Sequence, residues 1–154
     1  MKALMLAGMA LLWAAAADAQ PRGPATCEEA GAGLWSIDTG ENGNGIRTFY
    51  DGQVTVIALN LIEPAAAPGG VAIVMPGPPN DEEPTGPECF AFVGYDRVDV
   101  AGARSDYDPT RGLILTFPTW RFDEARQDSV PAPPLRVRID VGRGTVDVVG
   151  QVNR

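Results

Sequence analysis

Short runs of alternating or β-branched residues recur along this chain from residue 34 onward, and clusters of Gly, Pro, Asn and Asp separate them. Helical periodicity is nearly absent over the same region. This spacing is typical of all-β proteins, in which a turn follows each short strand. We therefore predict an all-β fold, either a single β-sandwich or a small antiparallel β-barrel. The expected strands are Leu34 to Asp38, Ile46 to Tyr50, Gln53 to Ile62, Val71 to Met75, Cys89 to Gly94, Arg97 to Val100, Leu113 to Phe117, Thr119 to Asp123, Leu135 to Val141 and Thr145 to Val152.

Three proline-rich segments are expected to lie outside these strands. They are 63-EPAAAPGG-70, 76-PGPPNDEEPTGPE-88 and 128-DSVPAPP-134. Proline lacks the N–H donor that a strand ladder needs, so we exclude all three from the sheets. The third segment is expected to isolate the final hairpin from the strands before it.

Two hairpins can be registered from the sequence. Asp51-Gly52 joins two alternating runs and predicts a two-residue type I′ turn, which pairs Phe49 with Val54 and Ile46 with Ile57.

In the final hairpin, a turn at Gly142-Arg143 sets Arg138 opposite Asp147, whereas a turn at Arg143-Gly144 sets Asp140 opposite Asp147. Directly opposed like charges are disfavoured, so the first register is expected.

Between these hairpins, Leu113, Leu115 and Phe117 share one parity, and Trp120 and Phe122 fall on the other. A change of parity moves side chains to the opposite face of a strand, so we predict a bulge or a strand break at Pro118-Thr119.

The first 19 residues have the pattern of a secretory signal peptide. Lys2 supplies a positive charge, Ala3 to Ala17 is an apolar run, and Ala17-Asp18-Ala19 offers small residues before Gln20. The alternative is a retained membrane anchor, but the run is shorter than the ~20 residues that a spanning helix needs. We expect cleavage to leave residues 20–154 as one domain, in the periplasm or outside the cell and without stable membrane insertion.

The charge of the chain excludes several classes of function. Its net charge is −8, which disfavours nucleic acid as a partner. After Lys2 there is neither Lys nor His, a bias that fits a GC-rich bacterial genome. Serine triads and Ser-Lys dyads therefore lack a base, and zinc, copper and haem sites lose their main ligands. We expect no catalytic residue, metal site or cofactor.

The chain has two cysteines, Cys27 and Cys89. In an exported protein such a pair predicts a disulfide. A free catalytic thiol is the alternative, but no His is present to activate it.

The stretch that starts at Asp38 resembles a calcium loop only in part. An EF-type loop needs oxygen ligands at its third and twelfth positions, which here are Gly40 and Phe49. We therefore predict turns from Asn42 to Gly45 rather than an ion site.

Gly33-Leu34-Trp35 resembles the Gly-x-Trp that opens the first strand of calycins such as lipocalins and avidins. The resemblance implies that Trp35 closes the base of a barrel, a structural duty that names no ligand residue. We expect Trp35 and Trp120 to be core anchors, and contact with a ligand is the alternative for both.

Carboxylates are the remaining source of chemistry. Two acidic clusters stand out, one of Asp81, Glu82, Glu83 and Glu88 and one of Asp96, Asp99, Asp106 and Asp108. We interpret both as solvated loop charge. The sequence thus favours a non-enzymatic binding, inhibitory or envelope-associated module with an unknown protein or small-molecule ligand. A carboxylate-based, glycosidase-like hydrolase is the alternative, and it needs two acids in one cleft.

Overall fold

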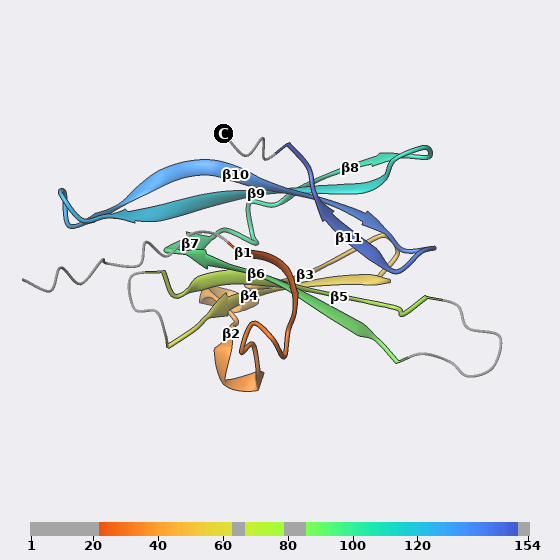
Figure 1. Ribbon diagram of the computed structural model, residues 1–154, viewed down its shortest axis with the longest axis horizontal. Coiled ribbons are helices and arrows are strands. Elements are labelled where there is room, and N and C mark those ends of the chain that lie inside the picture. The colour runs from red at the N-terminus through yellow and green to blue at the C-terminus, as the bar shows by residue number, and fades with distance from the viewer. Residues whose placement is uncertain (1–21, 63–66, 79–85, 151–154) are drawn as a thin grey trace, which may run out of the picture.

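The structure of the protein is a computed structural model that describes residues 22–62, 67–78 and 86–150. Over these residues the strands form two antiparallel sheets, which lie as two layers in Figure 1. The predicted all-β class is confirmed, in the form of a sandwich. The expected signal segment 1–19 lies outside the described residues, so its cleavage stays a prediction.

The first sheet has six strands in the order β1-β6-β5-β4-β2, with β3 also paired to β4. The strands are β1 (Arg22–Thr26), β2 (Ile37–Asp38), β3 (Ile46–Phe49), β4 (Val54–Asn60), β5 (Gly69–Met75) and β6 (Glu88–Tyr95). Two short 3-10 helices, η1 (Leu34–Ser36) and η2 (Glu41–Gly43), flank β2. The N-terminal part of the expected strand Leu34 to Asp38 is therefore helical.

The second sheet has five strands in the order β11-β10-β9-β7, with β8 also paired to β9. The strands are β7 (Arg97–Val98), β8 (Arg104–Asp108), β9 (Gly112–Asp123), β10 (Asp128–Asp140) and β11 (Thr145–Val148). β1 and β8 were not among the strands expected from the sequence. Two expected strands, Leu113 to Phe117 and Thr119 to Asp123, are one continuous strand, β9.

The core lies between the two sheets. Alternate residues of β4, β5 and β6 face those of β9, β10 and β11, as the period of two in a strand requires. Phe92 from the first sheet and Phe117 and Leu115 from the second are almost fully buried. Buried residues from both sheets form one large cluster, so the inner face of each sheet depends on the other for its burial.

Both predicted hairpin registers are confirmed. Phe49 pairs with Val54 and Ile46 with Ile57 across β3 and β4. Asp51 and Gly52 have φ of 53° and 83°, as a type I′ turn requires, but Tyr50 also takes a positive φ of 54° and ends β3 one residue early.

In the final hairpin Arg138 lies opposite Asp147. Nη2 of the arginine donates to Oδ2 of the aspartate at 2.8 Å, the contact that distinguished the two registers.

The prediction for 128-DSVPAPP-134 was wrong, because β10 begins at Asp128 and pairs with β9 along this segment. β11 pairs only with the later residues 137–140 of β10, so the proline segment is an edge with one neighbour. A proline on an edge can turn its nitrogen toward solvent, where no ladder bond is lost.

The irregularity expected at Pro118-Thr119 lies on the partner strand. β9 keeps its parity, and Thr119 is buried on the same side as Phe117. The register shifts between Ala132 and Leu135 of β10, directly opposite. The Thr119 hydroxyl donates to the carbonyl of Pro133 at 2.8 Å, so the bulge supplies an acceptor for this buried hydroxyl.

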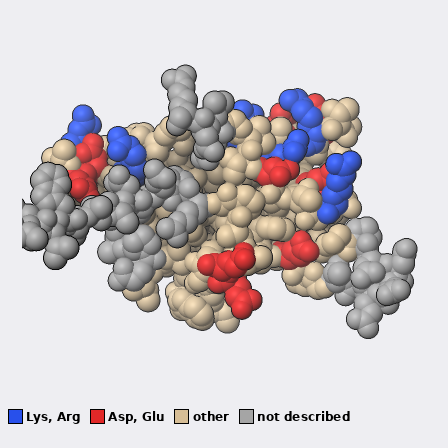
Figure 2. Space-filling model, in the orientation of Figure 1, with Lys and Arg blue, Asp and Glu red and all other residues tan. Residues whose placement is uncertain are grey.

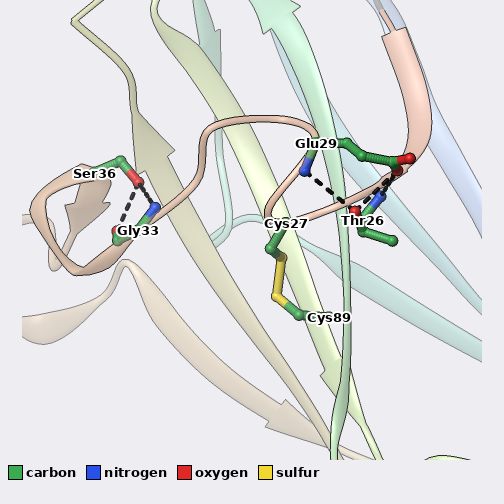
Figure 3. Close-up of a disulfide and its surroundings, with 6 residues drawn as sticks. All are labelled: Thr26, Cys27, Glu29, Gly33, Ser36 and Cys89. Atoms are coloured by element: carbon green, nitrogen blue, oxygen red, sulfur yellow. Dashed lines mark hydrogen bonds between the residues drawn. A yellow bond between two sulfur atoms is a disulfide. The ribbon is translucent and has the colours of Figure 1, made fainter.

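The segment after β1 lies against the outer face of the first sheet. Cys27 and Cys89 form the predicted disulfide, with their Cα atoms 5.4 Å apart (Figure 3). The segment also holds two local turns, one in which Thr26 donates to Glu29 and one in which Ser36 donates to the Gly33 carbonyl. Behind it a small apolar cluster of Leu59, Ala72 and Ala91 is buried. The disulfide is typical of an oxidising compartment.

Candidate functional site

Trp35 and Trp120, for which ligand contact was the alternative to a core position, lie on different elements, η1 and β9. Trp35 lies in η1 with 76% of its surface exposed, so the expectation of a core anchor was wrong for this residue. Its indole folds back over Gly33, where a Cβ atom would overlap the ring. The barrel-closing duty implied by the calycin resemblance is therefore not observed, because the ring packs on its own turn and not inside a barrel.

Trp120 is half-buried on β9. The guanidinium of Arg97 lies 4.0 Å from its ring centroid, a cation–π contact that occupies one face of the indole. The two tryptophans line neither of the clefts described below.

The loop that resembles a calcium site has turn geometry. Gly40 N donates to the Asp38 carboxylate at 2.8 Å, and Asn42 and Gly43 both have positive φ. Gly45 N then donates to the carbonyl of Thr39 at 2.8 Å. A Cβ atom at Gly45 would overlap the carbonyl of Asp38, so glycine is required by close approach of the backbone. The predicted turns are confirmed.

The structure describes one residue of the first acidic cluster and all four residues of the second. Asp81, Glu82 and Glu83 lie outside the described residues, and Glu88 begins β6. In the second cluster Asp99 accepts from Gly102 N in a turn, and Asp106 is exposed on β8. Within the described part of the chain, no three His, Cys, Asp or Glu side chains lie close enough to hold a metal ion.

A cleft of about 250 Å³ lies where the β3–β4 turn of one sheet meets β8 and the β10–β11 turn of the other. We call it the tyrosine cleft. Figure 2 shows basic and acidic side chains next to one another at this end of the molecule. Its lining residues include Tyr50, Tyr107, Thr110, Arg111, Arg138, Asp140, Arg143 and Asp147.

Two aromatic rings meet at this cleft. Tyr50 and Tyr107 have ring centroids 5.7 Å apart and planes tilted by 38°. Both side chains are exposed, at 40% and 54%. The hydrogen bond with the Tyr50 hydroxyl is the main cause that raises the pKa of Tyr107 above its usual value. The pair is held together by contact between the sheets but remains open to solvent.

Tyr50 has a left-handed backbone, with φ of 54°. A bulky L-residue is rare in this region, because its Cβ approaches the backbone, at a cost of about 1–2 kcal/mol. Strain of this kind persists where surrounding contacts hold it, and it is common at binding sites.

Arginines on the cleft wall are each paired with an aspartate. Arg138 Nη2 lies 2.8 Å from Asp147 Oδ2, and Arg143 Nε lies 3.6 Å from Asp140 Oδ2. Arg111 Nη2 lies 2.8 Å from Asp108 Oδ2 in the β8–β9 turn, where Asp108 also accepts the N–H and hydroxyl of Thr110. These contacts place a carboxylate beside each guanidinium.

Asp108 is expected to titrate at unusually low pH. Hydrogen bonds from the Thr110 hydroxyl and N–H, and then contact with Arg111, lower its pKa to about 2. Because the pKa is lowered by folding, the stabilisation is present above the unfolded value of about 4 and is lost as pH falls through 2. Carboxyl ¹³C NMR should locate this midpoint, and Thr110→Ala should raise it. A midpoint near 4 in the wild type would contradict the geometry of the turn.

A second cleft, of about 500 Å³, lies between β2 and β4 of the first sheet and β7 and the start of β10 in the second. We call it the aspartate cleft, because Asp38, Asp96 and Asp128 line it together with Arg97 and Ser129. The Ser129 hydroxyl oxygen is buried and has no hydrogen-bond partner among the described residues.

Sequence reasoning missed both tyrosines. Tyr50 directly precedes the Asp51-Gly52 turn, which could have indicated an aromatic residue presented at the tip of a hairpin. Tyr107 lies in 104-RSDYD-108, which forms an edge strand but has no alternation of apolar and polar residues from which a strand could be predicted. Charged residues are common on edge strands, because they prevent pairing with other chains.

Comparisons with known proteins add no assignment: no protein-family model, curated protein or solved structure matches this chain. Across the described ranges, no helix combines the length and apolar character needed to cross a membrane.

Proposed function

We propose that this chain is an exported, non-enzymatic binding module of the periplasm or the extracellular space, and that its ligand binds in the tyrosine cleft. The disulfide between Cys27 and Cys89 supports export, since such bonds persist in oxidising compartments. The acidic composition continues to disfavour nucleic acid as the ligand.

The observation that carries this proposal is the conformation of Tyr50. The chain keeps a bulky aromatic at a left-handed position where glycine or asparagine would fit without strain. The ring that results is exposed and adjoins Tyr107 at the cleft. The strain is retained although 40% of the Tyr50 surface stays exposed, and strained residues of this kind cluster at binding sites, which supports a role in binding.

The aspartate cleft supports a second candidate, the carboxylate-based hydrolase. Asp38, Asp96 and Asp128 come from separate elements and line one cleft, as paired-acid chemistry requires. The unpartnered Ser129 hydroxyl adds a group that a ligand could satisfy. We rank this candidate second, because Arg97 in the same cleft is engaged with Trp120 and the cleft offers no pair of exposed aromatic rings.

Protein-observed NMR with a library of small polar compounds tests the choice between the clefts. The library should include monosaccharides, amino acids, dicarboxylates and inorganic phosphate. We expect at least one compound to shift the amides of Thr110 and Gly142 beside the tyrosine cleft, and Tyr107→Ala to abolish that shift. Asp96→Asn, in the aspartate cleft, is the matched control and should leave the shift unchanged.

Two results would contradict the proposal. Compounds could shift only the amides of Asp96 and Ser129, or the protein could hydrolyse a chromogenic glycoside with loss of activity in Asp96→Asn. Either result would move the function to the aspartate cleft.

A further inference from the structure

The tyrosine cleft holds little uncompensated charge. Its three arginines, Arg111, Arg138 and Arg143, each lie within 4 Å of an aspartate oxygen, at 2.8, 2.8 and 3.6 Å. Because the arginine and aspartate charges cancel in pairs, a charged ligand meets little net opposite charge in the cleft. The arrangement favours a ligand without net charge.

Many hydrogen-bonding groups in the cleft remain for a ligand. A guanidinium has five N–H donors, and the ion pair of Arg138 with Asp147 uses one of them in a single contact at 2.8 Å. Both partners are half-exposed, at 46% and 54%, and the Arg143 side chain is more open still at 80%. Arginine donors and aspartate acceptors therefore lie beside one another on the cleft wall. A ligand with several adjacent hydroxyl groups would use donors and acceptors together.

The two tyrosine rings supply the apolar part of the site. The two ring planes are tilted by 38° and both residues are partly exposed, so the pair offers aromatic surface at the mouth of an open cleft and not a deep apolar pocket. Such a surface suits a ring with C–H bonds on one face and polar groups on its edge, because aromatic faces attract the positive ends of C–H bonds. The modest cleft volume, about 250 Å³, fits a small part of a longer ligand.

From these contacts we infer that the tyrosine cleft binds a neutral saccharide, with a hexopyranose ring on the Tyr50–Tyr107 pair and its hydroxyls on the Arg138–Asp147 and Arg143–Asp140 pairs. This inference rests on the proposed function, since it names the class of ligand for the same cleft. The open cleft lets a chain continue beyond the bound ring, so an oligosaccharide should bind better than a monosaccharide.

The test is calorimetry and protein-observed NMR on the full-length mature chain with a panel of neutral oligosaccharides. The panel should contain gluco-, galacto-, manno- and N-acetylated hexopyranose series, each as monosaccharide and hexasaccharide. We expect at least one hexasaccharide to bind at the amides of Thr110 and Gly142. Loss of a stacking ring in Tyr107→Ala should weaken binding about tenfold.

Two further variants separate binding from folding. Tyr50→Asn removes the ring but retains a residue that tolerates a left-handed backbone, so binding should fall about tenfold while the melting temperature is unchanged or higher. Trp35→Ala removes a more exposed ring outside the cleft and should leave affinity within twofold.

The outcomes distinguish this inference from the proposed function. If no saccharide binds but inorganic phosphate or another library compound shifts the cleft amides, the saccharide inference is wrong and the binding module stands. If nothing shifts those amides, both are wrong. Saccharide binding that Trp35→Ala abolishes and Tyr107→Ala leaves intact would also overturn the inference.

Discussion

Replacing Cys27 and Cys89 by serine is expected to lower the free energy of unfolding by about 4 kcal/mol. The disulfide closes a loop with a sequence separation of 62 residues, and loss of the cross-link restores that conformational freedom to the unfolded chain. The native state also loses the anchor of the segment that covers Leu59, Ala72 and Ala91 on the outer face of the first sheet. Urea unfolding of the two proteins should show the difference, with a larger m-value for the variant because its unfolded state is less compact.

A reducing agent supplies the control. Reduction should destabilise the wild type by a similar amount and leave the serine variant unchanged. The wild type should also show no free thiol when it is denatured without reductant. A loss below 1 kcal/mol, or a reactive thiol in the denatured wild type, would show that the cross-link is absent or carries little of the stability.

Local sequence information was sufficient for both hairpins. The register of β3 and β4 depends on Asp51-Gly52, and that of β10 and β11 on the attraction of Arg138 to Asp147. In each hairpin a single short turn joins the two strands, so the register can be predicted without knowledge of the rest of the fold. The same is true of the turns from Asn42 to Gly45, where Asn42 and Gly43 adopt the positive φ that Asn and Gly tolerate.

The prediction failed where a neighbour distant in sequence decides the outcome. Prolines 131, 133 and 134 are tolerated in β10 because β11 pairs only further along the strand, and the sequence of β10 alone does not contain that fact. Trp35 was assigned to the core from its residue type, but η1 turns the ring back over Gly33. β8 was missed because its side chains are charged or exposed, so its sequence lacks the apolar–polar alternation that marks a half-buried strand.

The candidate site was hidden for the same reason. Tyr50 belongs to the first sheet and Tyr107 to the second, and their contact at 5.7 Å exists only once the sheets have packed. The three acids of the aspartate cleft come from three separate elements in the same way. Sequence reasoning could exclude His-based chemistry, because the absence of His from the sequence is complete without structure, but it could not group the residues that remain.

Removal of the Arg47 side chain is expected to cost about 3 kcal/mol of unfolding free energy. Its Nη1 atom donates from β3 to the carbonyls of Val100, Ala101 and Ala103 at 3.3, 2.9 and 2.7 Å. Nη1 has two hydrogens, so we count two charge-assisted hydrogen bonds at about 1.5 kcal/mol each, the lower end of their range because the site is half-buried. Arg47→Ala therefore removes the hydrogen bonds that join β3 of the first sheet to the β7–β8 connection of the second.

Chemical denaturation should compare Arg47→Ala with Arg104→Ala, a matched loss of an exposed arginine on β8 that is expected to stay within about 0.5 kcal/mol of wild type. Arg47→Lys should fall between them, because an ammonium can still donate but lacks the planar fork. The Arg47 contact also precedes both rings along the chain, because Tyr50 follows Arg47 by three residues and Tyr107 follows Ala103 by four. Its loss should therefore separate the two rings and raise the amide exchange of residues 100–103. Equal stability of Arg47→Ala and Arg104→Ala would show that the sheets are held by their apolar core alone.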